Sequence, residues 1–417
     1  MRKKRLTAGL LALGISASLI FQTPVLAEEA AADTQAAAST ISTNAIPGWP
    51  QAADITSEAA VVMDDTTNTI LYAKNMDEAL FPGSTVKIMT CLLALENSSL
   101  TDQVTMTATG VSGVTDGGAN ISSQVDEVFT IEQCLYAIMV ASANDIALQV
   151  AEHIGGSVEA FVQMMNARAQ ELGCTNTVFT NPTGLPDPNQ HTTAHDMALI
   201  MKTAIENQAF RPIAAATSYT IPATNKSGGA RNLTNKFTMN DPAAANYYEG
   251  CIGGKEGYTE ASGSTLVCAA ERNGMTLICV VLKGASGQTT PDAASILDYG
   301  FGQFQALYLG DEDFSLISGG DVIVPVGTGS DALTVQDTQG EDQIQRTYLF
   351  GGTAVGTAVL EVVEEQDDTA VIEGEKNMQE ALDYSASHTA IPYFVIAGVF
   401  VVLMGFFIWR IVKVVRG

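Results

Sequence analysis

The sequence has few positive charges for its length. Its 417 residues hold 20 lysines and arginines against 46 aspartates and glutamates, a formal net charge of −26. Nucleic-acid binding needs clusters of cations that neutralise phosphates, so this balance excludes a nucleic-acid-binding protein. The six cysteines include no closely spaced pair such as C-x-x-C, and no internal repeat is present. The cysteine spacing therefore points to no particular disulfide framework.

Apolar residues are abundant and make up 46% of the sequence. That proportion is ample for a hydrophobic core and excludes a mainly disordered protein. The length predicts two globular domains, or one large domain with appendages. The two ends of the chain are the places where apolar residues are most concentrated.

The N-terminus has the pattern of an export signal. Four cations at positions 2–5 precede an apolar run at 6–21, and small residues precede the expected cleavage point after Ala27. This pattern predicts a signal peptide over 1–27, whereas a buried helix would not explain the cations. Residues 28–50 are rich in Ala, Thr and Ser, which predicts a flexible leader with regular structure starting near Ala59.

The C-terminus has the pattern of a membrane anchor. Residues 391–409 form an uncharged run of 19 residues, close to the 20 or so that span a bilayer. Cations follow it in a short tail at 410–417, and an acidic stretch at 367–390 precedes it. The positive-inside rule then predicts a single-pass protein of the cell membrane with a cytoplasmic C-terminus. Its stalk (367–390) and everything before it would lie on the extracytoplasmic side.

Between the ends, hydrophobic patterns predict an α/β (α+β) domain over 51–306. A hairpin is predicted from apolar runs at 59–63 and 69–73, and further strands at 251–258, 265–270 and 275–282. Helices are predicted at 85–96, 131–140, 143–154, 158–172 and 194–206. Strand pairs on both sides of a helical region predict one antiparallel sheet, assembled from both ends and flanked by helices. A small all-β domain is predicted over 307–366, from its Gly, Val, Thr and Asp content and short alternating runs.

One pair of cysteines faces each other in the predicted sheet. A tight Asn273-Gly274 turn places Cys268 opposite Cys279, within the range of a disulfide. A packed pair of free thiols is the preferred interpretation, and Cys91 and Cys134 are expected to be buried thiols as well.

Three short motifs carry the candidate chemistry. Ser84 and Lys87 are spaced i, i+3 at a predicted helix start, where a neutral lysine can act as base for a serine nucleophile. Ser142 and Asn144 lie at a break between two predicted helices, which could present them to a cleft. Lys255 follows two glycines on a predicted strand and could bind a carboxylate. Each motif alone is weak, since S-x-x-K arises by chance and polar turns between helices are common.

Together, S-x-x-K, S-x-N and a K-x-G strand resemble the signature of penicillin-binding proteins and class A β-lactamases. The segments 82–90, 139–145, 179–185 and 191–198 follow the order and spacing seen in one branch of that superfamily. The chain is thus similar to the low-molecular-mass D-alanyl-D-alanine carboxypeptidases. The resemblance implies their fold, no cofactor and no metal, and peptidoglycan stem peptides ending in D-Ala-D-Ala as substrate. It also implies β-lactams as covalent inhibitors.

The resemblance also assigns roles to individual residues. Ser84 would attack the carbonyl between the two D-alanines, and Lys87 would take its proton. Ser142 would relay a proton to the leaving amine, and Asn144 would orient the peptide. Lys255 would pair with the terminal carboxylate.

The third motif departs from the family pattern K-T-G. Glu256 stands where the family has a threonine, whose hydroxyl helps to hold the substrate carboxylate. A regular strand would turn Glu256 away from Lys255, and Thr259 or a water could then supply the missing hydroxyl. Gly257 would admit the substrate backbone, and the backbone amide of Tyr258 would complete an oxyanion hole with Ser84.

These observations predict a serine-type D-alanyl-D-alanine carboxypeptidase. A β-lactamase is the nearest alternative among enzymes, although no clear deacylating glutamate follows Asn144. The substitution at Glu256 keeps a third reading open, a catalytically weak, membrane-anchored wall-binding or scaffold protein. His191 and His195 are spaced i, i+4, but a third ligand is missing nearby, so a metal site is not expected.

Overall fold

The computed structural model describes residues 41–114, 118–310, 315–362, 401–406 and 408–410. The predicted signal peptide, the acidic stalk and the cytoplasmic tail beyond residue 410 lie outside these residues, as does most of the predicted anchor. Residues 401–406 and 408–410, at the end of that anchor and the first position of the tail, are helical. Across the described part of the chain, no helix meets the length and apolarity needed to cross a membrane.

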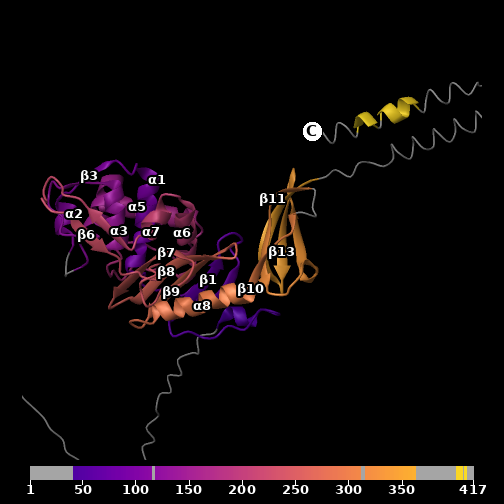
Figure 1. The fold of residues 1–417 in the computed structure, drawn as a ribbon, viewed down its shortest axis with the longest axis horizontal. Coiled ribbons are helices and arrows are strands. Elements are labelled where there is room, and N and C mark those ends of the chain that lie inside the picture. Colours follow the sequence, from indigo (N-terminus) through magenta and orange to yellow (C-terminus); the bar gives the residue numbers. More distant parts are fainter. Residues whose placement is uncertain (1–40, 115–117, 311–314, 363–400, 407, 411–417) are drawn as a thin grey trace, which may run out of the picture. The chain divides into compact units, whose positions relative to one another are not determined.

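The catalytic-domain prediction of one antiparallel sheet built from both ends is confirmed (Figure 1). Its strand order is β2-β1-β9-β8-β7. The strands are β1 (Ala59–Asp64), β2 (Ile70–Lys74), β7 (Cys251–Thr259), β8 (Gly263–Arg272) and β9 (Met275–Gly284). Pairing of β1 with β9 joins the N-terminal hairpin to the C-terminal strands. The arrangement leaves β7 as an edge strand, which is the strand that carries the third motif.

Both faces of this sheet are covered, which explains why β1, β9 and the middle of β8 form continuous apolar runs rather than alternating with polar residues. In β1, Val61 and Met63 pack into the core beneath helices α1 and α6, whereas Ala60 and Val62 pack into the core beneath α8. Helices α1, α3, α5, α6 and α7 gather on the first side, and α8 lies on the second (Figure 1). The helix bounds are α1 Lys87–Asn97, α2 Ala108–Ser112, α3 Ile131–Val140, α4 Asn144–Gly155, α5 Val158–Glu171, α6 Ala194–Glu206, α7 Phe210–Ala214 and α8 Thr289–Gln303.

The predicted helices agree with these bounds to within a few residues. The capping box at the start of α3 is present, with Gln133 N donating to Thr130 Oγ1 at 3.2 Å and Thr130 N to Gln133 Oε1 at 3.0 Å. Helix α8 was not predicted, because Pro291, Gly300 and Gly302 weaken its helical pattern. Its glycines are accommodated: Gly300 packs against Leu277 of the sheet.

The leader prediction is wrong for residues 41–50. A short 3₁₀ turn, Ser42–Ala45, begins the described chain, and Ile41 bridges Lys74 at the sheet edge. Trp49 is 4% exposed, and its indole N–H donates to the carbonyl of Leu71 at 3.1 Å. The buried Trp49 and hydrogen bonds to the side chains of Thr43 and Asn44 thus order a stretch whose composition indicates flexibility.

A second antiparallel sheet follows α8, with the order β10-β11-β14-β13-β12. Its strands are β10 Phe304–Tyr308, β11 Leu316–Pro325, β12 Thr334–Gln339, β13 Gln343–Phe350 and β14 Thr353–Glu361. Two small hairpins lie near the helices, β3 (Gln103–Thr105) with β4 (Val128–Thr130) and β5 (Ser218–Ile221) with β6 (Arg231–Thr234). In the main sheet Cys268 lies opposite Cys279, as predicted, and all six cysteines are free thiols.

Candidate active site

The nucleophile motif begins in a 3₁₀ turn, Gly83–Val86, rather than in the α-helix that the sequence predicted from residue 85. The hydroxyl of Thr85 donates to the carbonyl of Pro82 at 2.7 Å and tightens this turn. Residues i and i+3 eclipse each other in 3₁₀ geometry, so Ser84 lies directly over Lys87. Lys87 Nζ donates to Ser84 Oγ at 3.1 Å, which brings together the two predicted partners.

Lys87 is fully buried, and no carboxylate forms an ion pair with it among the described residues. Its ammonium position is fixed by Ser84 Oγ and by the carbonyl of Thr183. Burial in this site, and secondarily the positive charge of Lys255, hold the pKa of Lys87 well below its ordinary value. A lysine in this environment favours the neutral amine, which is the form that can accept a proton from a serine hydroxyl.

The segment before Leu185 provides the backbone partner of Lys87. Asn181 Oδ1 accepts hydrogen bonds from the amide and hydroxyl of Thr183 and from the amide of Gly184, at 3.2, 2.8 and 2.8 Å. The hydroxyl of Thr90 donates to the carbonyl of Pro182 at 2.8 Å. The carbonyl of Thr183 is therefore held rigidly toward Lys87. Sequence reasoning assigned this segment no role, because a backbone carbonyl leaves no side-chain signal.

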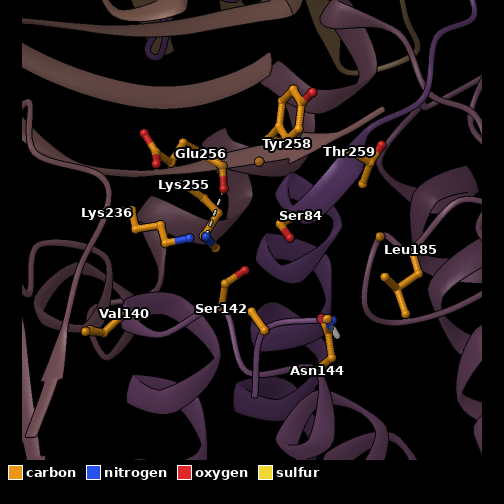
Figure 2. A pocket seen from close by; sticks show the side chains of 14 residues that line it. Ser84, Val140, Ser142, Asn144, Leu185, Lys236, Lys255, Glu256, Tyr258 and Thr259 are labelled. Atoms are coloured by element: carbon orange, nitrogen blue, oxygen red, sulfur yellow. Dashed lines mark hydrogen bonds between the residues drawn. The ribbon is translucent and has the colours of Figure 1, made fainter. Parts of the chain in front are cut away.

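The second motif lies between α3 and α4, where the sequence predicted a helix break. Ser142 adopts a left-handed conformation with φ of 57°, which is uncommon for a residue other than glycine. Ser142 Oγ and Asn144 Oδ1 are both buried, and neither has a hydrogen-bond partner among the described residues. The Asn144 residue as a whole is 4% exposed. Buried polar atoms are normally paired, so these two oxygens indicate a site that is completed by a ligand. Both side chains face the Ser84 region (Figure 2).

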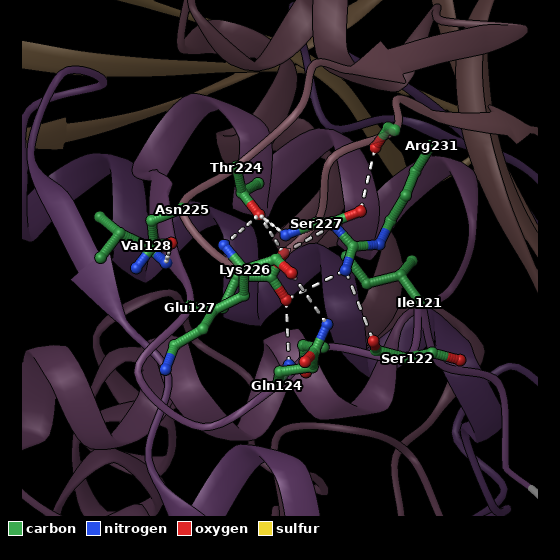
Figure 3. Close-up of polar contacts among 12 residues, drawn as sticks. Ile121, Ser122, Gln124, Glu127, Val128, Thr224, Asn225, Lys226, Ser227 and Arg231 are labelled. Atoms are coloured by element: carbon green, nitrogen blue, oxygen red, sulfur yellow. Dashed lines mark hydrogen bonds and ion pairs between the residues drawn. The ribbon is translucent and has the colours of Figure 1, made fainter.

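A loop from Gly118 to Glu127 supports the second motif from outside. Asn144 N donates to the carbonyl of Ala119 at 2.7 Å, and the carboxylate of Asp145 accepts from Ser123 Oγ at 2.8 Å. The loop is in turn fastened to the β5–β6 connection by a buried ion pair, with Arg231 Nη1 and Nη2 at 2.8 and 3.0 Å from the Glu127 carboxylate (Figure 3).

This ion pair, with its hydrogen-bond partners, is called the Glu127 clasp below. The Glu127 side chain is 0% exposed and accepts further hydrogen bonds from the hydroxyl of Thr224 and the amide of Gln124. Burial alone would raise the pKa of the carboxyl, but the hydrogen bonds from Arg231 and Thr224 outweigh it and lower the pKa. Glu127 is thus held ionised and fully paired.

The third motif lies on the edge strand β7. Lys255 is 2% exposed and donates to the carbonyl of Glu256 at 2.9 Å. Burial lowers the pKa of Lys255 to about 8, with Glu256 opposing and Lys236 adding to this effect. Gly257 lies so close to the nucleophile that a Cβ built on it would be 2.5 Å from Ser84 N. The free edge of β7 and the amide of Ser84 therefore meet, as an oxyanion hole formed with Tyr258 N requires.

Two residues of this strand clarify the departure from K-T-G. The carboxylate of Glu256 points away from the Lys255 ammonium, as the strand geometry predicted (Figure 2). The hydroxyl of Thr259 is paired with Ser262 Oγ at 2.8 Å and accepts from Ser262 N at 2.9 Å. The suggestion that Thr259 replaces the missing motif hydroxyl is therefore not favoured. The Tyr258 side chain is 67% exposed, so only its backbone belongs to the site.

The three motifs line one cavity of about 250 Å³. Its wall is formed by Ser84, Gly118, Ala119, Val140, Ser142, Asn144, Gly184, Leu185, Lys236 and residues 255–259. All nine residues singled out from the sequence lie in or directly below it, with Lys87 beneath Ser84. Lys236 is the charged residue that sequence reasoning missed, because no motif or spacing marks it.

Comparisons with known proteins identify the family of this chain. Residues 47–286 match the D-alanyl-D-alanine carboxypeptidase family, Peptidase S11. The chain is 34% identical over 257 residues to the D-alanyl-D-alanine carboxypeptidase DacF of Bacillus subtilis, covering 60% of this chain and 63% of that protein. It is 32% identical over 250 residues to DacB2 of Mycobacterium tuberculosis, covering 58% of this chain and 81% of that one.

Solved structures give the same result. A D-alanyl-D-alanine carboxypeptidase from Mycobacterium tuberculosis matches with a TM-score of 0.56 and 29% identity, over 61% of this chain and 95% of that one. Penicillin binding protein 6B of Escherichia coli shares the fold with a TM-score of 0.63 at 22% identity, over 76% and 98% of the two chains. The family match covers more than half of the sequence, and the chain belongs to the D-alanyl-D-alanine carboxypeptidase family of serine peptidases.

Proposed function

We propose that this protein removes the terminal D-alanine from peptidoglycan stem peptides, through an acyl-enzyme that penicillins also form. The observation that carries the proposal is the 3.1 Å contact between Ser84 Oγ and a fully buried Lys87 that lacks an acidic partner among the described residues. A buried neutral amine beside a serine is suited to general-base activation of that serine.

The residues of the cavity account for each step. Ser84 Oγ attacks the carbonyl between the two D-alanines while its proton passes to Lys87. The amides of Ser84 and Tyr258 stabilise the oxyanion, a contribution of about 3–4 kcal/mol per donor in related chemistry. Ser142 passes a proton to the leaving amine, and D-alanine departs. Water then hydrolyses the ester and restores the Ser84 hydroxyl.

Substrate placement involves the remaining motif residues. Asn144, whose Oδ1 has no partner in the structure, accepts a hydrogen bond from the peptide amide. The substrate lies along the free edge of β7, in the manner of strand addition, because Gly257 leaves room for another backbone. Lys255 lies close to the terminal carboxylate.

Covalent labelling and product release test this function together. The protein is incubated with fluorescent penicillin and, separately, with a peptide ending in D-Ala-D-Ala. We expect stable labelling that is lost in Ser84→Ala, together with release of free D-alanine. Rapid turnover of penicillin would instead indicate a β-lactamase, and a protein that neither labels nor releases D-alanine would be a scaffold.

The location of the protein is part of the same proposal. The sequence patterns support export through the signal peptide 1–27 and single-pass anchoring by 391–409, with the acidic stalk (367–390) and a small β-rich domain (307–366) between anchor and enzyme. The catalytic domain would then act outside the cytoplasmic membrane. Deletion of residues 391–417 should release the protein from the membrane fraction, and protease added to intact protoplasts should cleave the ectodomain but not the tail.

A further inference from the structure

Lys236 is placed in the cavity by a rigid stretch of backbone. Its neighbours Asn235 and Phe237 are buried, at 6% and 1% exposed. Asn235 N donates to the carbonyl of Thr217 at 2.8 Å, Asn235 Nδ2 to that of Ala216 at 2.8 Å, and Phe237 N to Asn235 Oδ1 at 3.0 Å. The backbone on both sides is therefore fixed, and the exposed Lys236 side chain extends from this anchored position along the wall of the cavity.

The ammonium groups of Lys236 and Lys255 point toward each other (Figure 2). Two like charges converge at one place although the whole chain carries a net charge of −26. No hydrogen bond or ion pair to Lys236 is found in the described part of the chain, whereas most of its lysines have a carboxylate nearby. Convergent cations without a protein anion between them are suited to binding a ligand anion.

The charge balance of the third motif points to the same conclusion. A K-T-G strand offers one cation and one neutral hydroxyl. Here Lys255 and Glu256 sum to zero charge, and adding Lys236 restores a net charge of +1 at the cavity wall. The hydroxyl of Thr259 is already paired with Ser262, so it does not compensate for the lost threonine.

We propose that Lys236 is a substrate-binding residue, which together with Lys255 holds the terminal carboxylate of the D-Ala-D-Ala peptide and offsets the negative charge of Glu256. This inference rests on the proposed carboxypeptidase function. Lys236 stands on the Lys255 side of the cavity, across from Ser84 and the amide of Tyr258 (Figure 2). With the scissile carbonyl in the oxyanion hole, the leaving D-alanine extends toward these two lysines.

Two acyl donors that differ only in the leaving group distinguish a loss of carboxylate binding from a structural defect of the active site. The first is an acyl-D-Ala-D-Ala peptide, and the second is a thioester of the same acyl-D-alanine with an uncharged thiol. We expect Lys236→Ala to lower kcat/KM for the peptide by at least about tenfold and to change that for the thioester by less than about twofold. Lys236→Arg should retain most of the peptide activity, because it keeps the charge. Lys226→Ala serves as the matched control, since Lys226 is a surface lysine outside the cavity and should leave both rates unchanged.

A double-mutant cycle then tests the link with Glu256. In the Glu256→Thr background the motif hydroxyl is restored, so loss of Lys236 should cost at least about threefold less than in the native protein. Equal losses with both donors would show a structural role, and no loss with the peptide would also overturn the inference. A native protein that releases no D-alanine would overturn the proposed function and this inference together, whereas native activity with an indifferent Lys236 overturns the inference alone.

Discussion

Lys87 of the cavity and Glu127 of the clasp are both buried ionisable side chains, yet their surroundings are arranged in opposite ways. In the clasp, Arg231 and two other donors surround a carboxylate that is 0% exposed. In the cavity, Lys87 is equally buried, but within the described part of the chain its ammonium nitrogen hydrogen-bonds only to a hydroxyl and a carbonyl. The clasp lowers the pKa of an acid and keeps it charged, whereas the cavity lowers the pKa of a base and keeps it neutral.

These arrangements have opposite effects on stability. The depressed pKa of Glu127 contributes stability that is present above the unfolded pKa and is lost as pH falls through the folded one. The depressed pKa of Lys87 opposes folding at pH values below the unfolded pKa, because the unfolded chain binds a proton there that the native site excludes. Pairing a buried charge therefore holds a loop in place, and leaving it unpaired creates a reactive group.

The largest predicted effect comes from removing the unpaired amine. Lys87→Met keeps the length of the side chain but removes the base, and it should slow acylation of Ser84 by fluorescent penicillin by at least about 10³-fold. Because the lost group is one whose burial opposes folding, the thermal midpoint should fall by little or even rise. A large loss of stability with the acylation rate retained would reverse the assignment of roles.

A substitution in the Glu127 clasp should instead lower the stability of the protein. Arg231→Ala leaves Glu127 buried without its cation and should lower the free energy of unfolding by about 3 kcal/mol, measured by chemical denaturation. Glu271→Ala removes one side of an exposed pair with Arg211 and, as control, should cost less than about 1 kcal/mol. A loss no greater than that of the control would show that the clasp does not hold the loop.

The pH dependence of the peptide reaction should reveal the titration of Lys87 and of Lys255. Activity is expected to rise with pH as Lys87 loses its proton, at pH values well below the ordinary lysine range. It should fall again as pH passes about 8, where Lys255 loses the charge that attracts the substrate carboxylate. The thioester with an uncharged leaving group should keep the rising limb and lack the falling one. If activity fell in the same way with both donors, the fall would not be caused by weaker binding of the substrate carboxylate.

The smallest predicted effect concerns the departure from the family motif. Glu256→Thr restores the hydroxyl while Lys236 remains, so kcat/KM for the peptide should rise by less than about tenfold. A rise above about 10²-fold, or some 2.7 kcal/mol, would show that the native site is severely impaired by Glu256. Steady-state release of D-alanine measures the difference directly.

The sequence predicts those parts of the site that depend on local spacing. Ser84 and Lys87 meet because of an i, i+3 relation, and Ser142 and Asn144 are recognisable at the break between two helices. The direction of Glu256 follows from the alternation of a regular strand. The antiparallel sheet is predictable because apolar runs flank 64–68 in its first hairpin and Asn273-Gly274 forms the turn of its last one.

The parts that depend on distant segments were not predictable. Lys236 reaches the cavity only because the chain after β6 is fastened to Ala216 and Thr217. The carbonyl of Thr183 becomes a partner of Lys87 through tertiary packing across 96 positions of the chain. The order of residues 41–50 depends on Trp49 finding a place in the core, which composition does not reveal.

The close approach of Gly257 to Ser84 has a consequence for resistance to covalent inhibitors. The two proposed oxyanion donors are main-chain amides, so among substitutions only proline removes an N–H group directly. A side chain at position 257 would collide with the main chain of Ser84, which disables turnover of the natural substrate along with inhibitor capture. Selection under a β-lactam therefore has little scope at the centre of this cavity. Tolerated changes should instead accumulate at its rim, where Glu256 and Lys236 distinguish one leaving group from another.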